Sequence, residues 1–486
     1  MAEPLRKAAG ALAGRSPALA AGALFVLAVP QIYLLPEGRI DIALTTVVTG
    51  LLAPGLLLVV WRGAGRSLLR LWLVRVLLGL IAIRVLALAW SPEPRSGLQP
   101  IVVLGQFAVT VALMAQLLRR EPGQVRLLHW LYWPWVAAEA ALVVLFRVAP
   151  DVEDGFLRTA GGWFAGQNTV GALFGEGRNN VLDVAKSGGV FVNANVAAMF
   201  LGVNGLAALA LAVVTRQRWL RVLGVALLLT VPFTGSKSAT VLTVALPAAA
   251  FGIQQLTRAA APAVRRRLLA GSLIGGTAVI ALLLTVSAGL RDAMVEAFVG
   301  RTIIWRFGAE EFREHPVLGL GFGGWDDGFG PYAAAEGLDR SFPPHNVLLA
   351  AWANTGIAGL LLSAAFFALA AWLCARHMSR PGGDRRMVPF VAAAVAWVFV
   401  QGMGENTDLF GVIHLIPILS LLIAYLIRPA GEESKDSATN HRGDSATPTV
   451  PAVGDLHREP GGGAAELPAA VRGAGPGADH EESRVA

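Results

Sequence analysis

Two stretches in the last third of the chain hold the side chains best suited to catalysis. The first, RTIIWRFGAEEFREHPVLGLGFGGW, begins at Arg301, and the second, PPHNVLLAAWANTGIAGLL, places His345 directly after two prolines. A guanidinium stays charged at physiological pH and binds anionic oxygens. An imidazole, with an unperturbed pKa of about 6.5, exchanges protons at neutral pH. We therefore interpret Arg301 and His345 as candidate catalytic residues of a site that binds an anion and moves a proton.

Five further polar residues are candidates for substrate binding. Lys237 is the only charged residue of a short turn in PFTGSKSATVL. Arg84 lies inside an apolar segment, where a charge is costly unless it is paired or functional. We predict that the substrate is bound by Lys237, Arg84, Arg306, Asn346 and Asn195.

Another polar group stands between the last two apolar segments. The stretch GENTDLFGVIH carries Glu405, Asp408 and His414. With the residues above it forms a cationic cluster with one good base, on one face of the protein. Such a cluster suits an anionic headgroup held at a membrane surface.

The elements that must position these residues are membrane spans. The chain has 486 residues, of which 55% are hydrophobic and only 15% are charged, whereas a soluble protein has about 25% charged residues. Apolar runs long enough to cross about 30 Å of hydrocarbon recur along it. The sequence predicts an all-α polytopic membrane protein with about 12 transmembrane helices. The expected spans are 18–36, 41–61, 68–90, 98–118, 128–147, 190–214, 219–234, 238–256, 268–290, 346–375, 388–403 and 411–428.

The loops between these spans predict the orientation of the chain. Loops 62–70, 119–127, 215–221, 257–267 and 376–386 each hold three or four arginines, and the alternate short loops hold at most one basic residue. Basic loops stay in the cytoplasm, so both termini are expected there, with the chain in the cytoplasmic (inner) membrane. The net charge of +7 therefore does not indicate nucleic-acid binding.

This topology divides the chain into five segments. A cytoplasmic N-terminus (1–17) precedes spans 1–9 (18–290), and a large outer loop with an amphipathic helix (291–345) leads to spans 10–12 (346–428). The last segment, 429–486, is rich in Gly, Pro, Ser and charge. It is predicted to be a disordered cytoplasmic tail, because it cannot bury enough apolar surface to fold.

The outer loop is expected to contain a helix over 301–314. Trp305, Gly308 and Phe312 recur at helical spacing, and Pro316 ends the helix. An alternative is a helix in the membrane interface whose arginines extend toward the headgroups. His345 has a similar alternative, as a helix cap or an interfacial residue.

The stretch GLGFGGW, at 319–325, superficially matches a dinucleotide fingerprint. It follows no predicted strand and opens no predicted helix, so we interpret it as a turn. Glu311 and His315 stand four residues apart, as helical metal ligands can, but no third ligand is apparent and Cys374 is the only cysteine. We expect no metal and no cofactor.

In its motifs the chain resembles the O-antigen ligase/O-antigen polymerase family of bacterial membrane glycan transferases. The resemblance rests on NANVAAMF, on TGSKSA, and on R…W…F…HPVLGLGFGGW…HN…GIAGLL, and it covers about residues 190–425. It implies a metal-independent membrane glycosyltransferase of the cell envelope, acting in the biosynthesis of lipopolysaccharide or a similar polysaccharide. The glycan would move from a polyprenyl-pyrophosphate donor to a hydroxyl of a glycan or glycolipid acceptor at the outer leaflet, with inversion, among membrane lipids and without nucleic acid.

The resemblance also implies roles for particular residues. Arg301 matches the family's loop arginine, and His345 matches the loop histidine that orients or deprotonates the acceptor. Lys237 stands where the family has an arginine, and a lysine binds phosphate as a point charge rather than through a planar fork.

Three alternatives remain open from the sequence. A ligase gives a finished glycan to a different molecule, whereas a polymerase joins lipid-linked repeat units. A transporter of lipid-linked glycans would place its charged residues near the bilayer midplane, whereas the polar cluster here lies on the outer face. A non-catalytic scaffold would leave Arg84, Arg301 and His345 unexplained.

Overall fold

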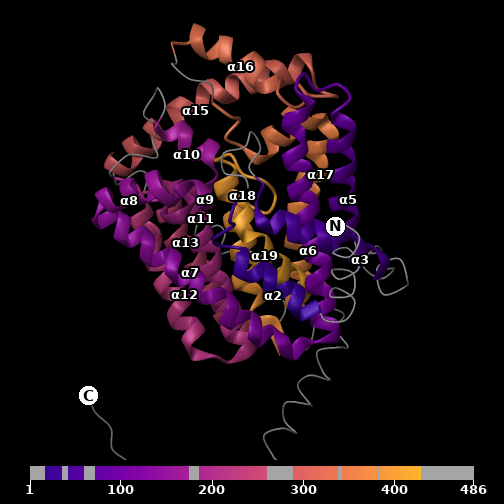
Figure 1. The fold of residues 1–486 in the computed structure, drawn as a ribbon, viewed down its shortest axis with the longest axis vertical. Coiled ribbons are helices and arrows are strands. Elements are labelled where there is room, and N and C mark those ends of the chain that lie inside the picture. Colours follow the sequence, from indigo (N-terminus) through magenta and orange to yellow (C-terminus); the bar gives the residue numbers. More distant parts are fainter. Residues whose placement is uncertain are drawn as a thin grey trace, which may run out of the picture. The chain divides into compact units, whose positions relative to one another are not determined.

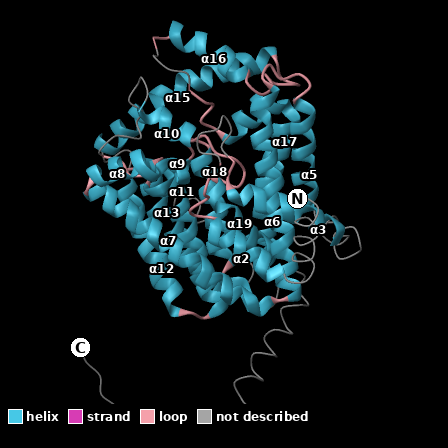
Figure 2. Cartoon of the chain, in the orientation of Figure 1, coloured by secondary structure: helices cyan, strands magenta, loops and turns pink. Residues whose placement is uncertain are grey.

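The part of the chain that can be described is almost entirely helical. In the computed structural model, helices connected by loops make up this part, and the isolated bridges Tyr33–Ala43 and Asp408–Gly411 extend into no strand within it (Figure 2). This confirms the all-α prediction. The described residues are 17–34, 42–59, 72–174, 185–259, 288–337, 342–379 and 383–427.

The predicted spans coincide with helices wherever they fall on described residues. In the first half these are α2 (Pro17–Leu27), α3 (Leu44–Val59), α5 (Trp72–Ala87), α6 (Leu98–Arg120) and α7 (Val125–Val148) (Figure 1). In the second half they are α11 (Ala194–Thr215), α12 (Arg218–Thr230), α13 (Lys237–Ala259), α17 (Val347–Ser379), α18 (Val388–Gly402) and α19 (Ile416–Ile427). Most of span 268–290, the start of the chain to residue 16 and the tail from residue 428 lie outside the described residues.

Several of these helices could cross a membrane. Five are long and apolar enough by length and composition: Pro94–Arg120, Pro122–Val148, Ala194–Thr215, Lys237–Leu256 and Val347–Met378. Four shorter apolar helices accompany them, among them Pro17–Leu27 and Ile413–Ile427. The first span is shorter than expected because the chain turns at Gln31 and Ile32, which have φ of 53° and 41°. The chain is a multi-pass membrane protein, and the number of twelve spans stays a prediction.

Helix α11 is the most buried of the long helices, and small residues let its neighbours approach. A Cβ on Gly202 would lie 2.2 Å from the ring of Trp397 on α18. At the crossing with α12, a Cβ on Gly205 would lie 3.0 Å from the backbone oxygen of Gly224. Close packing of this kind holds helices together in a bilayer, where apolar burial alone does not.

A short chain of hydrogen bonds joins the end of α18 to the start of α11. The indole Nε1 of Trp397 donates to Oε1 of Gln401 at 2.7 Å, and Nε2 of Gln401 donates to the backbone oxygen of Asn195 at 2.9 Å. Asn193 caps α11 by accepting from the backbone N–H of Asn195 at 2.9 Å. These contacts fix the first turn of α11 beside the loop that follows α18.

The segment predicted as the large outer loop (291–345) contains two helices. Figure 1 shows α15 (Ala288–Glu314) beside α16 (Gly324–Ala335), and α16 also packs against α17. The helix predicted over 301–314 is confirmed, although it begins earlier. Its apolar face buries Ile304 and Phe307 and leaves Phe312 37% exposed.

The glycine-rich stretch forms a turn, as predicted, because Gly319, Gly321 and Gly323 have φ of 68°, 76° and 86°. The interpretation that it opens no helix was wrong, since α16 begins at Gly324. Trp325 and Phe329, one helical turn apart, both pack their rings on Phe307 at 5.0 and 5.3 Å. This aromatic burial offsets the low helix propensity of the glycines.

Candidate functional site

The loop between α18 and α19 (residues 403–412, here the α18–α19 loop) connects two groups of polar side chains. The backbone N–H of Asp408 donates to the oxygen of Gly411 at 3.1 Å, and the N–H of Gly411 donates back at 2.8 Å. Gly411 has φ of 74°, which a residue with a side chain rarely adopts. The turn sets the direction of two carboxylates: Glu405 contacts Arg301 of α15, and Asp408 contacts Arg84 of α5.

The first group is cationic overall, and we call Arg301, His345, Lys186, Asn195 and Glu405 the cationic site. Nη2 of Arg301 donates to Oε1 of Glu405 at 3.0 Å, and the two side chains are 24% and 13% exposed. Glu405 also accepts from the side chain of Asn195. Burial raises the pKa of Glu405, while the charges of Arg301 and Lys186 oppose that rise. Two cations thus face one carboxylate.

His345 lies beside Arg301 in a strained backbone conformation. Its φ of 46° is in the left-handed region, which costs about 1–3 kcal/mol for a residue with a side chain. Its Nδ1 is buried and has no hydrogen-bond partner among the described residues. Burial lowers the pKa of His345, and the positive charge of Arg301 lowers it further. The imidazole is therefore neutral at pH 7 and can accept a proton.

The TGSK turn packs against the segment that carries Lys186. Gly235 has φ of 78°, and a Cβ there would lie 2.3 Å from the backbone oxygen of Ala185. The backbone N–H of Ser187 donates to the oxygen of Thr234 at 3.0 Å. Lys237 is exposed and is the first residue of α13. The turn therefore positions Lys186 for the cationic site.

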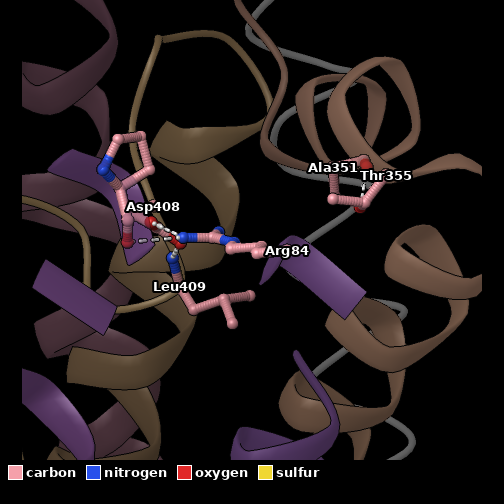
Figure 3. A network of polar contacts seen from close by, with 6 residues as sticks. Arg84, Ala351, Thr355, Asp408 and Leu409 are labelled. Atoms are coloured by element: carbon pink, nitrogen blue, oxygen red, sulfur yellow. Dashed lines mark hydrogen bonds and ion pairs between the residues drawn. The ribbon is translucent and has the colours of Figure 1, made fainter. Parts of the chain in front are cut away.

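Arg84 belongs to a different site. Its guanidinium forms a two-point ion pair with Asp408, Nη1 to Oδ2 at 2.8 Å and Nη2 to Oδ1 at 2.9 Å. Nη1 also donates to the backbone oxygen of Pro100 at 3.1 Å. Figure 3 shows this pair with Thr355 of α17 nearby. Arg84 is thus paired, which explains how a charge is kept at this depth.

A cavity of about 550 Å³ lies next to the Arg84–Asp408 pair. We call it the Arg84 cavity. Its polar lining includes residues of α5, the segment before α11, α17 and the α18–α19 loop. The lining residues used below are Asn193, Asn354, Asn406, Thr407 and Phe191.

The remaining predicted binding residues have other contacts. Asn346 caps α17, because its Oδ1 accepts from the N–H groups of Leu348 at 3.0 Å and Leu349 at 3.1 Å. Arg306 is half exposed and turns toward α16, where Nε donates to the hydroxyl of Tyr332 at 2.8 Å and the guanidinium pairs with Glu336. The structure thus brings together Arg301, His345 and Asn195, with Arg84 across the α18–α19 loop.

The sequence alone missed two members of the cationic site. Glu405 was noted only as part of a polar segment, and its pairing with Arg301 depends on tertiary packing over 104 residues of chain. Lys186 carries no local motif, and only the packing of the TGSK turn reveals it. Within the described residues, no three His, Cys, Asp or Glu side chains gather closely enough to hold a metal ion.

The cationic site falls largely within a region that matches a known family. Residues 185–364 match the family model described as O-antigen ligase. This region of the chain is thus similar to the O-antigen ligase family. The match contains Lys186, Asn195, Arg301 and His345, and it confirms the resemblance seen in the sequence motifs.

A curated relative supports the same relationship over a shorter length. The chain is 33% identical over 145 residues to the exopolysaccharide production protein ExoQ of Rhizobium meliloti (strain 1021). The matched part covers 26% of this chain and 32% of ExoQ, so the chain spans about a third of that relative. Glu405, Asp408 and Arg84 lie outside the O-antigen ligase match.

Proposed function

We propose that the protein transfers a glycan from a polyprenyl-pyrophosphate donor to an acceptor hydroxyl at the outer leaflet of the cytoplasmic membrane. One observation carries the proposal: a fixed arginine lies beside a neutral, partly buried histidine within the region that matches O-antigen ligase. Arginine-rich loops on the opposite side of the predicted topology favour cytoplasmic termini and an outward-facing site.

In this reaction the cationic site stabilises the leaving group. Arg301 and Lys186 would bind the pyrophosphate oxygens, together with Lys237 at the end of the TGSK turn that packs against the segment of Lys186. Negative charge grows on these oxygens as the bond between the anomeric carbon and the phosphate oxygen breaks. Cations placed in advance are most effective in a site with little water. Glu405 acts as a positioning residue, because it holds the guanidinium of Arg301 at 3.0 Å.

His345 serves the acceptor. As the acceptor oxygen bonds to the anomeric carbon from the face opposite the pyrophosphate, its proton passes to the imidazole. The electron pair of the broken bond leaves with the pyrophosphate, and the anomeric configuration inverts. The low pKa of His345 keeps it in the accepting form.

A second candidate is polymerisation of lipid-linked repeat units by the same chemistry. It is favoured by the similarity to ExoQ, whose name refers to exopolysaccharide production. The two reactions differ only in whether the acceptor hydroxyl belongs to another lipid-linked glycan or to a different molecule.

The test uses the full-length protein in lipid nanodiscs with a polyprenyl-pyrophosphate oligosaccharide. We expect Arg301→Ala and His345→Ala to lower transfer about 100-fold or more, as removal of an electrostatic donor or a general base does. Arg313→Ala and His315→Ala are matched controls, because both side chains are exposed on or just after α15, and they should keep the activity.

The products separate the candidates. A ladder of lengthened lipid-linked glycan indicates a polymerase, and one discrete product that needs an added acceptor indicates a ligase. Absence of transfer with every acceptor, together with passage of the donor across a liposome bilayer, would replace the enzyme with a transporter.

A further inference from the structure

The Arg84 cavity has the size of a small-molecule site but little net charge. Its volume of about 550 Å³ lies within the range of roughly 300–1,000 Å³ that ligand sites occupy. The cation, Arg84, is neutralised by both oxygens of Asp408. His414, also in the lining, is buried and bonds through Nδ1 to the backbone oxygen of Ala28 at 2.9 Å. A phosphate would therefore find no uncompensated positive charge among the described lining residues.

The rest of the lining is suited to hydroxyl groups. Asn354 and Asn406 bring amide groups to the cavity that can both donate and accept, and the NH2 group of Asn193, whose oxygen caps α11, can donate. Oγ1 of Thr407 is buried without a hydrogen-bond partner among the described residues, although Thr407 lines the cavity. Phe191 adds an aromatic surface against which an apolar ring face can pack.

The cavity lies close to the cationic site through the α18–α19 loop. Glu405 faces the cationic site and Asp408 faces the cavity, and three residues of extended chain span at most about 11 Å. Asn193 lines the cavity, while the side chain of Asn195, two residues later, reaches Glu405. A ligand in the cavity would thus neighbour a pyrophosphate bound at Arg301.

From this arrangement we propose that the Arg84 cavity binds a neutral sugar ring, with the Arg84–Asp408 pair as its fixed polar wall. The inference rests on the proposed function, because a glycan transferase must hold sugar next to the pyrophosphate. The ring belongs either to the donor glycan or to the acceptor. The recognition chemistry, neutral hydroxyls against amides and a neutralised ion pair, is the same for both.

Thiol protection tests the inference without relying on activity. Cys374 is the only cysteine and is buried, so Asn354→Cys creates one reactive thiol in the cavity of the full-length protein in nanodiscs. The probe is the neutral oligosaccharide released by mild acid from the lipid-linked donor. At ten times its Kd it should slow labelling about tenfold, because protection follows 1 + [L]/Kd. Inorganic pyrophosphate should leave the rate unchanged.

Matched variants keep the result interpretable. Ala309→Cys, exposed on α15, should be labelled at the same rate with and without either probe. Asn406→Cys tests the opposite wall if Asn354→Cys fails to fold. Adding Asp408→Asn to the cysteine variant frees the charge of Arg84, and pyrophosphate should then protect the thiol.

Each outcome decides one point. Protection by pyrophosphate but not by oligosaccharide in the unaltered ion pair would make this an anion site and overturn the inference. Absence of protection by the oligosaccharide, the lipid-linked donor and pyrophosphate alike would also overturn it. Protection by the lipid-linked donor alone assigns the ring to the donor, and protection by the free oligosaccharide assigns it to the acceptor. Transfer activity measured in parallel separates the two proposals, since an active protein without protection refutes only the cavity assignment.

Discussion

The Arg84–Asp408 ion pair should contribute measurably to stability as well as to the shape of the cavity. Its side chains are 13% and 21% exposed, and it is bonded at two points, at 2.8 and 2.9 Å. Exposed pairs contribute about 0–1 kcal/mol, and breaking a buried pair costs about 3–5 kcal/mol. The partial exposure places the coupling between these limits, at about 2 kcal/mol, or about 30-fold in an equilibrium constant.

A double-mutant cycle measures this coupling. The free energy of unfolding is compared for the wild type, Arg84→Gln, Asp408→Asn and the double variant, in mixed detergent micelles with tryptophan fluorescence as the readout. The control cycle uses Arg158 and Asp154, a pair with the same 2.8 Å separation whose side chains are 58% and 48% exposed. That pair should show much weaker coupling. Equal coupling in the two cycles would refute the reasoning that burial strengthens the Arg84–Asp408 pair.

Three further predictions concern the cationic site and α17. Because burial and Arg301 lower the pKa of His345, transfer by the wild type should persist below about pH 6.5. Arg301→Gln removes the positive charge that lowers this pKa, so the acid limb of the variant's residual pH–rate profile should move to higher pH. An unmoved limb would contradict the interaction between Arg301 and His345. Gly356→Ala places a Cβ 1.9 Å from the backbone oxygen of Val317, at a φ of 68°. It should lower the free energy of unfolding by about 2 kcal/mol or more, measured by thermal unfolding. The control Gly252→Ala, whose Cβ would have open space around it, should not destabilise the protein. Asn346→Ala removes the cap of α17 and should cost about 1 kcal/mol, while Asn346→Asp keeps the cap; loss of transfer in a stable Asn346→Asp variant would restore Asn346 to the substrate site.

Much of the fold could be predicted from hydrophobic runs and arginine-rich loops, because length and charge largely decide what crosses a bilayer. The helix from 301 to 314 followed from its apolar spacing in the same way. The helix after the glycine-rich turn could not be predicted, since the contact of Phe307 with Trp325 and Phe329 that stabilises it is tertiary.

The candidate site was predictable only in part. Arg301 and His345 stood out by residue type and motif, and the structure places them together. The depth of Arg84 correctly indicated a paired or functional charge, but its partner is 324 residues away and no local pattern identifies it. Asn346 shows the opposite case, because an asparagine before an apolar run satisfies the rules for a helix cap and for a binding residue equally well.

The α18–α19 loop has a consequence for how the proposed enzyme would avoid wasting its donor. Glu405 and Asp408 lie three residues apart in one short loop, whose turn closes at Gly411, so a ligand that shifts the loop at one site would also act on the other. A water molecule that enters the cavity in place of a sugar is too small to contact this turn as a sugar ring would. The activated donor would then wait unhydrolysed until the second glycan arrives, and loosening the loop, for instance with Gly inserted after Glu405, should raise spontaneous hydrolysis of the donor relative to transfer.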